Sequence, residues 1–294
     1  MSQPTLYIVS TPIGNLSDFS IHAQHILSSV SFILCEDTRH TLKLLNHFNI
    51  KNKLESLHVH NEKNKLDYLI DKLLNSDTHS AALVSDAGTP AICDPGSYLV
   101  AAAHEKNIQI IIVPGPCSMT SALAASGFIQ PRSLFSGFLS KNKSDQYEEF
   151  TIWANTSPCV AVFFESPRRI LESLKNISDF FTNKYKLSDL EICVSREISK
   201  KFEEHRRSLL NTAIEHYQSC DEIQGEFVVS VNLNKVTDPE NKVTIEFAAK
   251  EAVLRSKLYN IQLKICCKEL AEKYGFNPKE IYSVACGIAL KFDV

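Results

Sequence analysis

In the first part of the chain, four short apolar runs each end abruptly in a polar or Gly/Pro-rich loop. Apolar residues with helical spacing fill the intervals, so the pattern predicts alternating strands and helices. Such strands pair in parallel and carry helices on both faces of the sheet. Their loops then meet at one sheet edge, where open α/β folds bind ligands. The expected strands are 6–9, 32–34, 81–84 and 110–113, the loops are 10–15, 35–40, 85–90 and 114–118, and the helices are 20–30, 38–48, 66–74 and 98–104.

A second group of apolar runs begins after Pro116. Phe-rich segments and the alternation of Val after Gly225 favour a mixed sheet with some antiparallel pairing. A helix of small residues opens this part, and its lack of bulk allows close packing against a neighbouring backbone. The expected strands are 134–138, 160–164, 191–195 and 225–231, and the expected helices include 118–126 and 168–174.

The C-terminal part differs in pattern from both. Residues 232–242 are polar and predict a linker. Apolar spacing then predicts a helix over 261–274 that ends at Gly275, and Asn277-Pro278 is typical of the start of another helix. Two helices around a short glycine turn indicate a helix-turn-helix-like tail. The chain is therefore expected to hold an N-terminal α/β domain over 1–114, a C-terminal α/β domain over 115–235 and a helical tail over 240–294, with a cleft between the two α/β lobes.

Composition restricts the class of protein. With 294 residues, 44% hydrophobic and 22% charged, the chain has the composition of an ordinary globular protein. Its start shows no signal-peptide pattern, and its apolar runs are far shorter than the roughly 20 residues of a membrane helix. Nine cysteines without a C-x-x-C pair indicate free thiols and a cytoplasmic location. The net charge of −3 argues against a broad basic surface, although residues 240–294 carry nine Lys/Arg against seven Asp/Glu, a net of +2.

Several common chemistries lack their motifs. There is no nucleoside-triphosphate or dinucleotide glycine loop and no G-x-S-x-G nucleophile elbow. His58, His60 and Glu62 alternate along a short segment and could hold a metal ion. Polar loop residues that contact a substrate are the favoured interpretation of this segment, so no metal is expected.

The strand-end loops instead suit a ligand held by the backbone. Glycines and prolines such as Gly88, Pro90 and Gly115 expose rigid main-chain groups with little side-chain obstruction. Asp86 ends its strand where a carboxylate could accept from a ribose hydroxyl or face a cation. A turn or helix-capping role for Asp86 is the alternative.

A cluster of charged residues follows the second strand. Glu36, Asp37, Arg39 and His40 place two carboxylates, a guanidinium and an imidazole within five positions. A surface ion-pair cluster at a helix start is one interpretation, because acids suit the helix dipole there. A catalytic site is favoured, because the cluster directly follows a buried strand.

Six ordered motifs make the chain similar to a known family. They are TPIGNL at 11–16, EDTRHT at 36–41, SDAGTP at 85–90, DPG at 94–96, PGP at 114–116 and GEFV at 225–228. Together they closely resemble the tetrapyrrole methylase superfamily, and within it the branch that methylates the 2′-hydroxyl of a cytidine in 16S ribosomal RNA. The resemblance covers residues 6 to about 232, and the helical tail resembles the extension of this branch.

The resemblance implies a homodimeric enzyme that binds S-adenosylmethionine in the cleft between its lobes and acts on 16S rRNA in the small ribosomal subunit. Glu36, Asp37, Arg39 and His40 become the hypothetical catalytic group, with a carboxylate as base. Cys117 departs from the small residue that is common after Pro-Gly-Pro, a change not expected to abolish binding. The implied donor-binding residues are Ser85, Asp86, Ala87, Gly88, Thr89, Pro90, Pro114, Gly115, Pro116, Cys117, Ser118, Phe164, Glu165, Ser166, Gly225, Glu226 and Phe227.

An RNA substrate raises the question of which cations contact it, since the chain is acidic overall. A local basic stripe together with shape recognition would be sufficient. The candidates are Lys141, Lys143, Arg168, Arg169, Lys200, Lys201, Arg206, Arg207 and the lysines of the tail.

Two other functions remain open at this point. One is methylation of a tetrapyrrole carbon by an enzyme of the same superfamily, against which the charged motif at 36–41 and the tail both argue. The other is a nucleic-acid-binding regulator that uses the α/β part as a ligand sensor, which the small positive charge of the tail disfavours.

Overall fold

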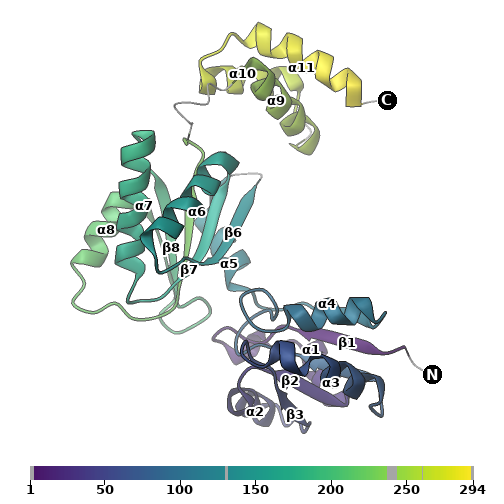
Figure 1. Cartoon of the computed structure of the whole chain (residues 1–294). Coiled ribbons are helices and arrows are strands. Elements are labelled where there is room, and N and C mark those ends of the chain that lie inside the picture. Colours follow the sequence, from purple (N-terminus) through teal and green to yellow (C-terminus); the bar gives the residue numbers. More distant parts are fainter. Residues whose placement is uncertain (1–2, 130–131, 237–243, 260, 293–294) are drawn as a thin grey trace. The chain divides into compact units, whose positions relative to one another are not determined.

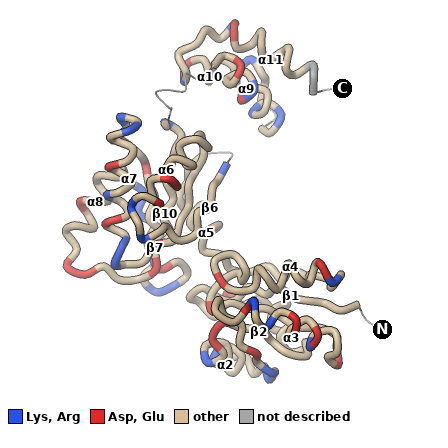
Figure 2. Tube along the Cα trace, viewed as in Figure 1, with Lys and Arg blue, Asp and Glu red and all other residues tan. Residues whose placement is uncertain are grey.

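The computed structural model describes residues 3–129, 132–236, 244–259 and 261–292 (Figure 1). The chain divides into two compact units, Met1–Lys235 and Val236–Val294. The larger unit contains two five-stranded sheets, one from each half of its sequence. Lys and Arg are interspersed with Asp and Glu along the chain (Figure 2).

The first sheet has the strand order β3-β2-β4-β1-β5, and every pairing in it is parallel, as the sequence pattern predicts. Strand β3 was not predicted. Its three residues are too few to show a period. The strands are β1 (Thr5–Val9), β2 (Phe32–Cys35), β3 (Leu54–Ser56), β4 (Ser80–Leu83) and β5 (Gln109–Val113), and the helical elements are η1 (Leu16–Asp18), α1 (Ile21–Ser29), α2 (Thr38–His47), α3 (Glu62–Leu74) and α4 (Ser97–Glu105).

Helices cover both faces of this sheet, because alternate strand residues point to opposite sides. Ile33 packs with residues of α1 and α2, such as Leu27 and Leu45. Its neighbour Leu34 packs with residues of α3 and α4, such as Leu69. The two buried clusters fix the carboxyl ends of the strands at one edge, where the loops predicted to bind a ligand emerge.

The second sheet has the order β6-β7-β10-β8-β9. Strands β6 and β7 pair in parallel and the other neighbours pair antiparallel, which confirms the predicted mixed sheet. The prediction missed β9 and the helices α6 and α8, and it ended α7 eleven residues too early. The elements are α5 (Ser118–Ser126), β6 (Ser133–Phe138), α6 (Lys143–Thr156), β7 (Val160–Glu165), α7 (Ile170–Tyr185), β8 (Glu191–Arg196), β9 (Glu204–Leu209), α8 (Leu210–Gln218) and β10 (Phe227–Asn232).

The unit Val236–Val294 is helical. Helices α9 (Ile245–Tyr259), α10 (Leu263–Tyr274) and α11 (Pro278–Phe292) share an apolar core that includes Cys266, Cys267 and Leu270. Gly275 ends α10 in the left-handed conformation with φ +72°, as predicted. The side chain of Asn277 accepts a hydrogen bond from the Lys279 N–H at 3.0 Å, which confirms the predicted cap of α11.

The predicted linker at 232–242 begins too early. Asn232 still belongs to β10, and the side chains of Leu233 and Val236 are buried. Residues 237–242 of this prediction lie outside the described residues. Each of the nine cysteines is free. Within the described ranges, no helix combines the length and the apolar character needed to cross a membrane.

One buried carboxylate links the two helices that cover the second face of the first sheet. Glu62, in the first turn of α3, is only 4% exposed. Its Oε1 accepts hydrogen bonds from the backbone N–H groups of Gly96, Tyr98 and Leu99 at 3.0, 2.9 and 3.2 Å. Gly96 is the N-cap of α4 and has no side chain to cap the helix, so Glu62 satisfies these donors in its place.

We therefore expect Glu62→Ala to lower the free energy of unfolding by about 2–3 kcal/mol, because it leaves buried backbone donors without an acceptor. Urea denaturation of the whole chain measures this loss. Glu105→Ala, an exposed change at the other end of α4, is the matched control and should shift stability by less than about 0.5 kcal/mol. Equal effects of the two substitutions would contradict the capping role of Glu62.

Candidate functional site

The larger unit contains a pocket of about 420 Å³ that is lined by residues of both sheets. The first sheet contributes the loops after β1, β4 and β5, and the second contributes the ends of β6 and β7, the loop after β8 and the start of β10. The carboxyl ends of parallel strands thus supply much of the pocket, as expected for an α/β fold.

Many of the predicted donor-binding residues line this pocket. They come from four separate segments of the sequence, which the fold brings together. Ser85, Pro90, Pro114, Gly115 and Pro116 do not line it, and Gly115 and Pro116 instead line a second cavity of about 510 Å³. The predicted residues in the lining are Asp86, Ala87, Gly88, Thr89, Cys117, Ser118, Phe164, Glu165, Ser166, Gly225, Glu226 and Phe227.

Other lining residues were not predicted. Phe135 and Phe138 belong to a strand whose pocket-facing side could not be known without its partner strand. Ile13 and Asp94 belong to the motifs at 11–16 and 94–96, so the family resemblance could have identified them as binding residues. The full set is Ile13, Ile92, Cys93, Asp94, Met119, Phe135, Phe138, Pro167, Ile198 and Val228.

The loop after β4 is fixed by the loop after β1. Thr11 and Gly88 exchange two backbone hydrogen bonds, of 2.9 and 3.1 Å, in an isolated antiparallel bridge. The Thr11 hydroxyl also donates to the Ser85 carbonyl at 3.1 Å, and the Ser85 hydroxyl donates to the Gly88 carbonyl at 3.2 Å. Gly88 has φ +84°, and a Cβ there would lie 3.3 Å from Cγ2 of Ile13, so both conformation and space favour glycine.

Three carboxyl groups gather beside this loop. Burial raises the pKa of Asp94, and the charge of Asp86 raises it further. Burial also raises the pKa of Glu36, followed by the charges of Asp94, Asp86 and Asp37. Within the described part of the chain, Glu36, Asp86 and Asp94 form no ion pair. A cationic ligand would relieve this concentration of negative charge.

The predicted catalytic cluster lies next to the pocket, although none of its four residues lines it. Asp86 Oδ1 accepts the backbone N–H of Asp37 at 3.2 Å and so connects the cluster to the pocket. Asp37 caps α2 through the backbone N–H of Arg39 at 2.8 Å. A 3.0 Å ion pair with the exposed Arg39 guanidinium completes this arrangement. These bonds lower the pKa of Asp37 to about 2.

The end of β7 is organised around a buried carboxylate. Glu165 accepts from the Ser166 N–H at 2.8 Å and from the Ser173 hydroxyl at 2.5 Å. The guanidinium of Arg169 lies 3.4 Å from it and donates to the carbonyls of Leu139 and Ser140 at 3.0 and 2.8 Å. Arg169, a candidate for RNA contact, therefore holds the loop after β6 against the start of α7.

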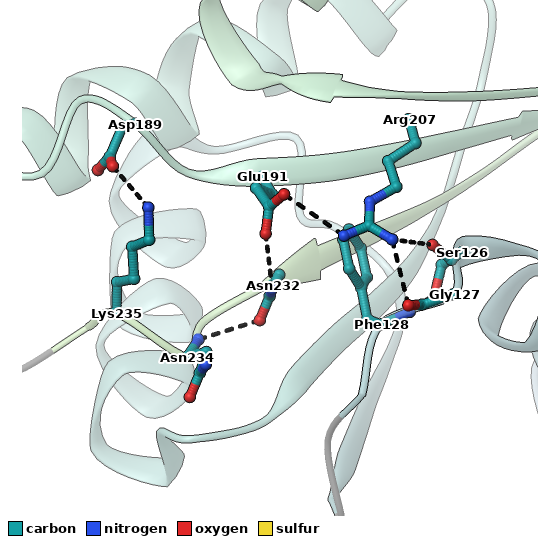
Figure 3. Close-up of polar contacts among 9 residues, drawn as sticks. All are labelled: Ser126, Gly127, Phe128, Asp189, Glu191, Arg207, Asn232, Asn234 and Lys235. Carbon is teal, nitrogen blue, oxygen red and sulfur yellow. Dashed lines mark hydrogen bonds and ion pairs between the residues drawn. The ribbon is translucent and has the colours of Figure 1, made fainter. Parts of the chain in front are cut away.

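A second arginine fixes the helix that borders the pocket (Figure 3). Arg207 on β9 donates to the carbonyls of Ser126 and Gly127, at the end of α5, at 3.3 and 3.1 Å. Its guanidinium lies 4.6 Å from the centre of the Phe128 ring and 3.4 Å from the carboxylate of Glu191. A cation at a helix C-terminus is stabilising because it faces the negative end of the helix dipole. Arg207, another candidate for RNA contact, thus makes its contacts within the protein.

His58, His60 and Glu62 do not form a metal site in the described structure. The carboxylate of Glu62 is committed to the start of α4, and the rings of His58 and His60 lie 6.1 Å apart between centroids. Across the described ranges, no group of three His, Cys, Asp or Glu side chains is arranged to hold a metal ion. None of the three residues lines the pocket.

Comparison with known proteins agrees with this architecture. A family model described as Tetrapyrrole (Corrin/Porphyrin) Methylases matches residues 5–214. The chain is 35% identical over 287 residues to the ribosomal RNA small subunit methyltransferase I of Pseudomonas aeruginosa, covering 97% of this chain and 98% of that protein. It is 45% identical over 203 residues to the Vibrio cholerae protein of the same name, covering 68% and 67%.

Solved structures share the fold at low sequence identity. A diphthine synthase structure has a TM-score of 0.58 at 16% identity, covering 79% of this chain and 90% of that one. The native uroporphyrin III C-methyltransferase of Thermus thermophilus has a TM-score of 0.54 at 13% identity, covering 77% and 96%. From the matching family model and the nearly full-length relatives, the chain belongs to the tetrapyrrole methylase family, and within it to the group of the ribosomal RNA small subunit methyltransferases I.

Proposed function

We propose that this protein transfers a methyl group from S-adenosylmethionine to the ribose 2′-hydroxyl of a cytidine in 16S ribosomal RNA of the small subunit. The family resemblance implies cytidine 1402 as the position. The observation that carries the proposal is the pocket shared by both sheets, with unpaired carboxylates beside its fixed β4 loop. Similarity over nearly the whole chain to ribosomal RNA methyltransferases supports RNA as the substrate. The likeness to the uroporphyrin enzyme concerns the fold alone.

The pocket residues fit this methyl donor. A volume of about 420 Å³ lies within the roughly 300–1,000 Å³ of small-molecule sites. The rings of Phe135, Phe138 and Phe164 offer apolar surface for an adenine ring, and Asp86 and Asp94 offer negative charge. When bound, the donor supplies an electrophilic methyl group on a positively charged sulfur, which these carboxylates would stabilise electrostatically.

Glu36 is the favoured proton acceptor among the predicted catalytic residues. A ribose hydroxyl is a poor nucleophile while protonated, so a positioned base accelerates its attack. The raised pKa of Glu36 brings its basicity closer to neutral pH, and no cation neutralises its charge within the described residues. Asp37 has a pKa of about 2 and is already engaged in starting α2, so it is the weaker base. Arg39 and His40 are exposed and are proposed to face the RNA.

Three broader features belong to the same proposal. The two sheets, which lie within the one compact unit Met1–Lys235, support domains over 1–114 and 115–235. The separate unit Val236–Val294 supports the tail over 240–294 as the third. The protein is proposed to act as a homodimer in the cytoplasm. Its partner is the small ribosomal subunit, and the donor-binding set includes the predicted residues outside the pocket, such as Pro114 and Gly115.

Incubation of unmodified small ribosomal subunits with labelled S-adenosylmethionine tests the function. We expect label in 16S rRNA, mapped to the 2′-oxygen of a single cytidine. Uroporphyrinogen III under the same conditions is the comparison substrate and should remain unlabelled. Labelling of the tetrapyrrole and not of the RNA would reject the proposal.

Asp86→Asn and Asp94→Asn test the donor site. Each removes a negative charge beside the pocket, so we expect the dissociation constant for S-adenosylmethionine to rise about tenfold, equivalent to ~1.4 kcal/mol. Isothermal titration calorimetry measures it. Asp179→Asn removes an exposed carboxylate that pairs with Lys143, and it serves as the charge-matched control. Donor affinities equal to that of the unaltered protein would remove both residues from the site.

Glu36→Gln tests the assignment of the base. We expect turnover to fall by about 10²–10⁴-fold, with donor affinity nearly unchanged. Because a base must be deprotonated, the rate of the unaltered protein should fall as the pH drops through the raised pKa of Glu36, above the ordinary glutamate value of about 4.3. The rate of the Gln variant should not show this decrease at low pH, which is the acid limb of the pH–rate profile. Asp37→Asn is the comparison variant and should keep the limb; its loss in that variant alone would make Asp37 the base.

A further inference from the structure

Cations near the pocket differ in whether a carboxylate of the chain neutralises them. Arg169 and Arg207 are engaged by Glu165 and Glu191 and by backbone carbonyls, as described above. Several other candidates for RNA contact are also paired. The further pairs are Lys143 with Asp179 at 3.1 Å, Lys200 with Glu197 and Glu226 at 3.0 Å each, and Arg206 with Glu204 at 2.6 Å.

Three exposed candidates in segments next to the pocket, Lys141, Arg168 and Lys201, form no ion pair with another described residue. The amine of Lys201 lies 5.4 Å from the centre of the Phe202 ring, which leaves Lys141 and Arg168 without a partner of either kind among the described residues. Lys141 follows Phe138, a pocket-lining residue, by three positions. Arg168 directly follows Pro167, which also lines the pocket. Both positive charges therefore belong to segments that leave the pocket at its rim.

Arg169 holds these two segments together. Its guanidinium donates to the carbonyls of Leu139 and Ser140, the two residues before Lys141, while its own backbone adjoins Arg168. The two cations are thus carried by neighbouring, fixed stretches of backbone. The acid nearest in sequence to Lys141 is Asp145, whose carboxylate accepts from the side chains of Ser140, Asn142 and Ser144.

The surroundings add to the attraction for an anion. Helices α6 and α7 both begin within two residues of these cations, and a helix N-terminus carries partial positive charge. Phe138 is 62% exposed at the end of β6. An exposed aromatic ring beside cations is the combination with which proteins hold a single RNA strand, by stacking on bases and pairing with phosphates.

We propose that Lys141 and Arg168 form a phosphate-binding site for the RNA strand whose ribose is methylated. The proposal rests on the proposed function, and it adds the residues that position the substrate. Phosphate contacts set the register of a nucleic acid on a protein. The carboxylates beside the β4 loop repel phosphate, so cations at the rim and acids beside the methyl donor would together direct the ribose inward.

The double variant Lys141→Ala/Arg168→Ala tests this site. Binding of small ribosomal subunits is measured over a range of salt concentrations, with donor affinity measured in parallel. We expect at least about tenfold weaker binding at low salt and a plot of log affinity against log salt that is shallower by about 1–2, since each phosphate contact contributes nearly one to the slope. Affinity for S-adenosylmethionine should not change.

The double variant Lys143→Ala/Lys235→Ala removes the same number of charges from lysines that are paired with Asp179 and Asp189. It should retain the affinity and salt slope of the unaltered protein. The proposal is overturned if the Lys141/Arg168 variant keeps the original slope, or if both double variants lose the same amount. Failure of the unaltered protein to methylate the subunits would count against the proposed function alone, because the slopes are measured by binding.

Discussion

The pocket depends on one local constraint, the pair of backbone hydrogen bonds between Thr11 and Gly88. This bridge fixes the loop after β4 to the loop after β1, and Asp86 of the same loop accepts from the backbone at the start of α2. Three strand ends of the parallel sheet are thereby held in one arrangement. A side chain at position 88 would strain the backbone and crowd Ile13, so the glycine preserves both the bridge and the pocket.

The consequence of this arrangement is electrostatic. Glu36, Asp86 and Asp94 are brought close enough to affect one another, and the pKa values of Glu36 and Asp94 are raised. Like charges held together without a counter-ion are unfavourable, and such arrangements are concentrated at functional sites. In the proposed function, Asp86 and Asp94, which line the pocket, attract the positively charged methyl donor, and Glu36, which lies outside the lining, serves as the base beside it.

Much of the fold could be predicted from short-range patterns. Four strands of the first sheet followed from apolar runs that end in polar or Gly/Pro-rich loops, and helices α1 to α4 followed from apolar residues with helical spacing. The start of α11 followed from its capping residue, whereas β3 was too short to be predicted. Strand β9 was missed because it is a charged edge strand, Glu-His-Arg-Arg, which lacks the apolar alternation of a half-buried strand. Helix α6 is anchored through Phe150, whose ring packs against the rings of Phe180 and Phe181 in α7, about 30 residues later in the sequence.

In the candidate site, too, the features that depend on residues distant in the sequence could not be predicted. Motifs located Asp86, Gly88 and Phe227 on the pocket because the backbone at strand ends determines where they lie. The roles of Arg169, Arg207 and Glu62 depend on carbonyl and N–H groups that are 29 to 81 residues away, so no local pattern could reveal them. Arg168 and Arg169 look equivalent in the sequence. Only the fold shows that Arg169 binds the backbone of the loop after β6, whereas Arg168 is an exposed charge without an ion pair among the described residues.

A crystal structure of the chain with S-adenosylhomocysteine, the product that remains after methyl transfer, would show directly where the methyl donor binds. We expect this molecule in the pocket between the two sheets, in contact with the loop at 86–89 and the residues around Cys117, with its sulfur on the side of Asp86 and Asp94. A product molecule bound elsewhere, with this pocket left to solvent, would contradict this expectation.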